Sequence, residues 1–225
     1  MKKIALLVPI LVAMPAMTIA QLTYTGFNGF KGQSYATATT GGRSNATTIP
    51  LGAGDMSLKS SGTLSGTAQV VTSPVQGFVA YMSDYNFRIG ILPVNLSNVR
   101  LTSPGTITVS GGPVGASLSF HLIATVELYS FTDLNGDGLY QLIEPKTFVR
   151  IPLATDTAYQ GASGAQFMFD LDRQNAQFSY GLAPFSNYFV RIKHTLTMSL
   201  DPSHTIPFSL TLSMPNWTET RIYKS

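Results

Sequence analysis

The sequence predicts an all-β protein, an antiparallel β-sandwich or Greek-key domain of the jelly-roll kind. Two observations support this prediction. Apolar and polar residues alternate with a period of two over long segments, and turn-forming residues separate those segments. Helical periodicity is nearly absent. Many strands at such spacing are typical of two sheets that share one core.

Two segments show the alternation most clearly, residues 118–128 and residues 188–200, where the even-numbered positions are mostly apolar. Both exceed the usual strand length, so we expect them to form the spine of one sheet. Further strands are expected over residues 87–91, 107–109, 149–153, 167–171, 178–180 and 206–214. Turns are expected at residues 103–105, 111–113, 135–138 and 201–202.

The composition limits the classes of function. The chain has 225 residues, of which 44% are hydrophobic and only 11% are charged, against roughly 25% charged in an average domain. Such a chain folds rather than staying disordered. It has no cysteine, which excludes disulfides, thiolate metal sites and cysteine nucleophiles. Loss of Lys2 and Lys3 would lower the net charge from +3 to +1, and no basic run indicates a nucleic-acid partner.

The first twenty residues have the pattern of a secretory signal peptide. Lys2 and Lys3 precede an apolar run over residues 4–14, and Thr18 and Ala20 place small residues at the −3 and −1 positions of a cleavage site. We therefore expect an extracellular or cell-surface protein that begins at Gln21 and has no membrane span after cleavage.

The remaining chain divides into three parts. Residues 21–30 form an apolar, strand-capable segment with Leu22, Tyr24, Phe27 and Phe30. Residues 31–67 are rich in Gly, Ser and Thr, and are expected to form either a tether or loop, or a weak β region. Residues 68–225 are expected to form the β-sandwich domain.

The sharpest local motif is DLNGDGLYQLIE, which matches the calcium-loop pattern D-x-[DN]-x-[DN]-G-x5-E at each fixed position. Calcium prefers clustered oxygen donors. The expected ligands are Asp133, Asn135, Asp137, the carbonyl of Leu139, and Glu144. The flanking segments are predicted strands rather than the helices of an EF-hand. A turn without metal is the alternative, because Asn-Gly and Asp-Gly are favoured in hairpins.

Three sequons, at Asn45, Asn95 and Asn216, are possible N-glycosylation sites in an exported chain. Asn45 is the most favourable, because it lies in the polar segment.

Catalytic patterns are missing from the sequence. His121, His194 and His204 form no close ligand pair, and His194 falls on the apolar face of its strand. Asp170 and Asp172 share a strand face beside Arg173, which indicates a solvated surface with a local ion pair. We therefore do not expect an enzyme.

The layout of the chain resembles the donor-strand subunits of archaeal threads and bundling pili, and of related TasA-like biofilm fibres. The shared features are the signal peptide, the short apolar N-terminal segment, the polar tether and the cysteine-free β domain with sequons. The resemblance implies a structural protein that polymerises when Leu22, Tyr24, Phe27 and Phe30 add a strand to the sheet of a neighbour. The alternatives are that the segment pairs within its own domain, and that the protein is a secreted, calcium-stabilised module that binds carbohydrate or protein.

Overall fold

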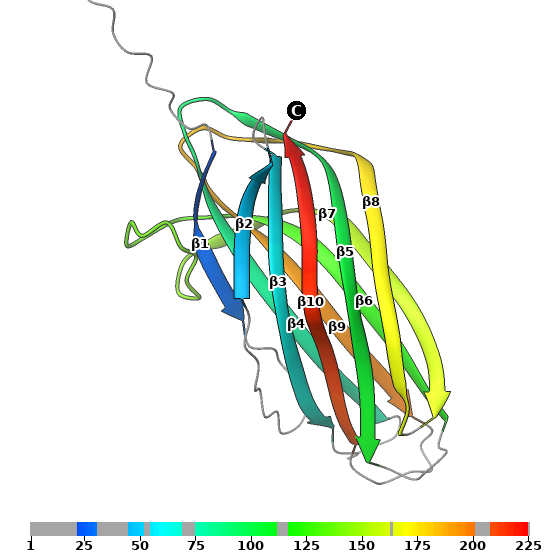
Figure 1. The fold of residues 1–225 in the computed structure, drawn as a ribbon. Coiled ribbons are helices and arrows are strands. Elements are labelled where there is room, and N and C mark those ends of the chain that lie inside the picture. Colours follow the sequence, from blue (N-terminus) through cyan, green and yellow to red (C-terminus); the bar gives the residue numbers. More distant parts are fainter. Residues whose placement is uncertain are drawn as a thin grey trace, which may run out of the picture.

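The computed structural model consists of two antiparallel sheets of five strands each, packed face to face (Figure 1). It describes residues 22–30, 45–51, 55–68, 75–111, 117–162, 164–200 and 208–224. The strands are β1 (Leu22–Phe30), β2 (Asn45–Leu51), β3 (Asp55–Ala68), β4 (Val75–Ile89), β5 (Val94–Gly111), β6 (Ser117–Phe131), β7 (Lys146–Ala162), β8 (Gln166–Leu182), β9 (Asn187–Leu200) and β10 (Phe208–Lys224). The predicted all-β sandwich is confirmed.

The strand order is that of a jelly roll. One sheet runs β1-β4-β9-β6-β7 and the other runs β2-β3-β10-β5-β8. From β3 to β10, successive strands alternate between the two sheets except at the β6–β7 hairpin, as in the double Greek key of that fold. The strands β6 and β9 lie side by side within the first sheet, so the expectation that they form its spine is confirmed.

The core lies between the two sheets, and the predicted alternation defines it. On β6, the side chains of Phe120, Leu122, Ala124, Val126 and Leu128 are all buried. Their neighbours on the other face of the sheet are more exposed. Burial of a large apolar side chain contributes roughly 1.5–3 kcal/mol, so the stability of the sandwich comes from packing.

The turn predicted at residues 103–105 is wrong, because these residues continue a strand. Residues 103–105 lie inside β5, where Pro104 pairs with Asp170 of β8. On the other side of β5, the pairing with β10 is interrupted between Ser213 and Glu219. Because proline has no N–H to donate, it is tolerated in this interior strand where the ladder is already broken.

Part of the Gly, Ser and Thr-rich segment forms strands. Both β2 and β3 fall largely within residues 31–67. Of the two expectations for this segment, a β region therefore describes these strands. Leu58 of β3 is fully buried in the common core. The sandwich therefore includes β1, β2 and β3, which lie before position 68 or end at it.

The predicted signal peptide, residues 1–20, and the cleavage product's first residue, Gln21, lie outside the described residues. Within the described ranges, the chain has no helix with the length and apolar character needed to cross a membrane.

Candidate functional site

The candidate site is the loop between β6 and β7, residues 132–145, which contains the calcium-like motif. Its first turn is closed by Asp133, whose Oδ1 accepts from the N–H of Gly136 and whose Oδ2 accepts from the N–H of Gly138, each at 2.8 Å. Gly136 and Gly138 both have φ of +77°, a left-handed backbone that favours glycine. The expected sharp turn at residues 135–138 is therefore confirmed.

The other side chains predicted to bind calcium also accept hydrogen bonds from backbone N–H groups of the loop. The side-chain oxygen of Asn135 accepts from the N–H of Asp137 at 3.1 Å, and Oδ1 of Asp137 accepts from the N–H of Leu139 at 2.7 Å. That backbone hydrogen bond holds the pKa of Asp137 below its ordinary value. The carboxylate of Glu144 is buried, and it accepts from the N–H groups of Leu134 and Gln141 at 2.9 and 2.8 Å.

The loop is thus a turn closed by its own hydrogen bonds. Among the described residues, no group of three or more His, Cys, Asp or Glu side chains comes together in a way that could hold a metal ion. The residues of the motif surround one turn, but their carboxylate oxygens accept backbone N–H groups. Calcium binding by Asp133, Asn135, Asp137, Leu139 and Glu144 stays a prediction.

Aromatic rings anchor the loop on the outer face of the sheet that contains β9. Tyr140 of the loop stacks on Phe189 of β9, with ring centroids 4.5 Å apart, and Phe131 contacts both rings. Lys146 lies over the rings of Tyr129 and Tyr140, at 5.4 and 5.0 Å from their centroids. Stacked pairs and cation–π contacts of this kind each contribute about 1 kcal/mol.

An ion pair is buried beside these rings. Arg191 of β9 donates two hydrogen bonds to Asp84 of β4, both at 2.7 Å, and its guanidinium lies 5.4 Å from the ring centroid of Tyr129. Burial raises the pKa of Asp84, although the hydrogen bond from Arg191 opposes the shift. Burial also raises the pKa of Tyr129 to about 12, together with its hydrogen bond to Glu127.

The predicted strand-exchange segment lies beside this loop as β1, at the edge of its own sheet (Figure 1). It pairs antiparallel with β4, with Leu22 opposite Ile89 and Tyr24 opposite Phe87. Leu22 packs partly buried against the core, and the ring of Tyr24 lies 5.9 Å from that of Phe87. The backbones of Phe27 and Phe30 also pair with β4, while their side chains lie outside the described part. In this structure β1 therefore pairs within its own domain, which is the alternative to strand exchange that the sequence left open.

A β-bulge brings β1 against the loop. The register skips Thr25 between Tyr24 and Gly26, and the freed Thr25 hydroxyl donates to the carbonyl of Gly138 at 2.5 Å. A Cβ at Gly26 would lie 2.3 Å from Cδ2 of Leu139, so a larger residue there displaces that side chain. The glycine thus leaves room for the Leu139 side chain against the strand.

Asn86 of β4 links the strand to the loop from beneath. Its Nδ2 donates to the carbonyl of Gly26 at 3.2 Å, and its Oδ1 accepts from the N–H of Tyr140 at 2.9 Å. The side chain is fully buried although it points to the outer face of the sheet. Sequence reasoning missed Thr25, Asn86 and Tyr140, and the one available signal was Gly26, a glycine inside a predicted strand.

The three sequons lie on different strands. Asn45 begins β2 and Asn216 lies in β10, and the side chains of both are outside the described part. Asn95 is exposed on β5, opposite Gly181 of β8. Glycosylation at Asn45, Asn95 and Asn216 stays a prediction.

The remaining polar candidates do not converge on this loop. His194 is fully buried in the core, where its Nε2 lies 2.9 Å from Oγ of Ser103. The exposed Asp172 forms its ion pair with Arg100 of β5, whose Nε and Nη2 lie 2.8 and 2.5 Å from its carboxylate oxygens. The partner expected from the sequence, Arg173, instead donates to the backbone carbonyl of Asp172. Cross-strand pairing thus replaces the expected local pair.

Comparisons with known proteins give no family. No family model matches the chain, and no curated protein matches it. Among solved structures, a TmCBM61 module in complex with β-1,4-galactotriose aligns over 82% of this chain and 88% of its own, with 6% identity and a TM-score of 0.20.

Two other solved structures were also found. The enzymatically active domain of bacteriophage CBA120 tailspike protein 4 aligns over 85% of this chain and 19% of its own, with 9% identity and a TM-score of 0.18. A structure of infectious bursal disease virus strain Gx aligns over 81% and 43%, with 8% identity and a TM-score of 0.20. These similarities are too low to support any functional argument.

Proposed function

We propose that this chain is an exported cell-surface protein that associates with copies of itself by exchanging β1. One observation supports this proposal above the others. Among the described residues, β1 is the first strand and lies at a sheet edge, where it pairs with β4 alone. An edge strand presents a pairing surface that another chain can use.

Exchange would rebuild the contacts that β1 already makes. A donated strand would place its Leu22 opposite the acceptor's Ile89 and its Thr25 beneath the acceptor's Gly138, as in the single chain. Because the contacts are the same, the balance depends on concentration. Covalent attachment of β1 to its own domain gives it an effective concentration of about 1 mM there, so we expect monomers at micromolar concentration and assembly where export concentrates the protein.

The 132–145 loop would set the rate of exchange. Before β1 can leave, Thr25 must release Gly138 and Asn86 must release the carbonyl of Gly26. Calcium bound by the predicted ligands would hold the loop closed and slow the exchange. Head-to-tail exchange forms an open filament when the rotation between neighbours does not close a ring.

Comparison of two purified forms tests this function, the chain beginning at Gln21 and the same chain without residues 21–30. Sedimentation velocity and negative-stain microscopy at millimolar protein should show polymers of the first form and monomers of the second. Circular dichroism should show that the shortened form keeps its sheets. If the first form stays monomeric at millimolar concentration, or if the shortened form polymerises as well, the proposal is wrong.

A further inference from the structure

A pocket of about 490 Å³ lies where the 132–145 loop leaves the sandwich and meets the turn between β8 and β9. Ser130, Thr132 and Thr147 line it from β6, the loop and β7. Phe185, Ser186 and Asn187 line it from the turn and the start of β9. Its volume lies in the lower half of the range for small-molecule pockets in proteins.

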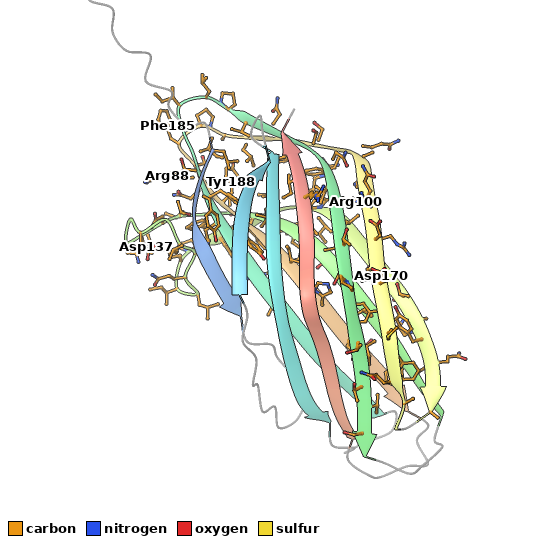
Figure 2. All side chains as sticks on the ribbon, in the orientation of Figure 1. Arg88, Arg100, Asp137, Asp170, Phe185 and Tyr188 are labelled. Atoms are coloured by element: carbon orange, nitrogen blue, oxygen red, sulfur yellow. The ribbon has the colours of Figure 1, made fainter. Side chains whose placement is uncertain are left out.

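Phe185 forms an aromatic edge to this pocket. Its side chain is 75% exposed, and Figure 2 shows it at the upper end of the sandwich, above Arg88 and Tyr188. Its φ is +56°, which is a strained conformation for a bulky residue. Two hydrogen bonds impose it, from the N–H of Phe185 to the carbonyl of Gly90 at 3.0 Å and from the N–H of Ile89 to the carbonyl of Ser186 at 2.9 Å. These bonds hold the backbone of Phe185 in a conformation that costs stability, at a residue whose ring is exposed.

The polar lining is almost entirely neutral. Hydroxyl groups come from Ser130, Thr132, Thr147 and Ser186. The described lining residues include no Lys or Arg, and the one carboxylate, Asp133, already accepts N–H groups from Gly136 and Gly138. This lining offers no cation to a phosphate or sulfate group, while its hydroxyl groups disfavour a purely apolar ligand.

Asn187 adds a polar atom without a partner. Its Oδ1 is buried and has no hydrogen-bond partner in the part of the chain that the structure describes. A buried acceptor without a donor is costly. Because Asn187 lines the pocket, a hydroxyl of a bound ligand would be the donor that this acceptor lacks.

From this combination we infer that the pocket binds a neutral saccharide, with Phe185 against the apolar face of a sugar ring and the hydroxyl groups and Asn187 in hydrogen bonds with sugar hydroxyls. An exposed aromatic ring beside neutral donors and acceptors suits a ligand that is apolar on one face and polar at its rim. The site uses no part of β1 and shares only Thr132, Asp133 and Pro145 with the 132–145 loop, so sugar binding is measured separately from strand exchange.

The test is isothermal titration of the monomer fraction of the mature protein with lactose, maltose, cellobiose and mannobiose, each to 20 mM. At least one should bind with a Kd of about 1 mM or lower, and glucose 1-phosphate and sodium sulfate should not bind. Phe185→Asn removes the ring but tolerates a positive φ. Its melting temperature should therefore be unchanged or higher, while its Kd rises at least tenfold.

Met168→Ala is the matched control, because Met168 is a highly exposed apolar side chain on β8 that does not line the pocket. This variant should bind as the natural chain does. Absence of binding to all four disaccharides, binding that Phe185→Asn leaves intact, or binding limited to the phosphate or sulfate would each overturn the inference. Polymer formation is measured on the same samples, so a failure of strand exchange is distinguishable from a failure of sugar binding.

Discussion

The hydroxyl of Thr25 donates to the carbonyl of Gly138 at 2.5 Å, across 113 residues of sequence. This contact ties the first strand of the sandwich to the loop between β6 and β7. It exists because a bulge frees Thr25 from the β1–β4 ladder and a left-handed glycine turns its carbonyl toward the strand.

Substitution of Thr25 by Val should loosen β1 while the sandwich stays folded. The change keeps the shape and removes the donor, at a cost of about 1 kcal/mol. Hydrogen exchange of residues 22–30 should become about fivefold faster. Thr23→Val is the control, because Thr23 is exposed in the same strand and should leave the exchange rate unchanged. Equal effects of the two substitutions would show that the Thr25 hydrogen bond does not hold the strand.

Substitution of Asn86 by Ala should loosen β1 and the loop together. It leaves the N–H of Tyr140 and the carbonyl of Gly26 without their side-chain partner in a buried place, and we expect a loss of about 2 kcal/mol in the free energy of unfolding. Urea unfolding measures that loss, and limited proteolysis should show new cuts both in residues 22–30 and in residues 132–145. The exposed Asn95→Ala on β5 should do neither. Cuts in one segment alone would argue against a shared anchor.

Calcium should stabilise the protein through the 132–145 loop. Binding at a hundredfold excess over Kd adds about 2.7 kcal/mol to the free energy of unfolding. The melting temperature should fall with EDTA, recover with calcium, and become insensitive to both in Asp137→Ala. Asp170→Ala, which removes an exposed carboxylate from β8, should keep the response. If the natural chain melts at the same temperature with and without EDTA, the motif is a hydrogen-bonded turn only.

The two-residue period predicted the strands well because one face of each strand meets the core. Leu122 on β6 and Ile192 on β9 follow that rule and are fully buried. The period does not predict what covers the outer face of a sheet. Asp84, Asn86 and Arg191 sit at polar positions of the alternation, yet all three are buried. Asn86 accepts a hydrogen bond from Tyr140 of the 132–145 loop, and Arg191 pairs with Asp84 beside the rings of Tyr129 and Phe189. Contacts such as Thr25 with Gly138 depend on the fold, so no local pattern indicates them.

Acidification should destabilise the fold through His194. Its burial lowers the pKa from 6.5 to about 4, so the imidazole is neutral in the folded state. In the unfolded chain, His194 takes up a proton below about pH 6.5. The stability that comes from the lowered pKa of His194 is therefore fully present above that pH. This stability is lost as the pH falls toward 4, and the free energy of unfolding should fall by roughly 2–3 kcal/mol between pH 7 and 4.5.

Urea unfolding at pH 7, 5.5 and 4.5 measures this slope. His194→Gln should unfold with a smaller pH dependence, whereas His121→Gln should not, because His121 is exposed beside Asp156. A slope that survives in His194→Gln would assign the acid sensitivity to other groups.

The central claim is that β1 of one molecule can occupy the place of β1 in another, and the absence of cysteine makes a direct measurement possible. Thr23 and Arg88 are exposed cross-strand partners in the β1–β4 ladder, at a spacing that suits a disulfide. Thr23→Cys and Arg88→Cys are made in separate molecules, mixed at millimolar concentration and oxidised. Strand exchange predicts a disulfide between positions 23 and 88 of different chains, identified by mass spectrometry of the digested dimer, and its yield should rise when Thr25 is also changed to Val. The doubly substituted chain, as a control, should close the same disulfide within one molecule at low concentration. If the control closes but the mixture gives no 23–88 link above the level found at micromolar protein, β1 stays in its own sheet and self-association by strand exchange is contradicted.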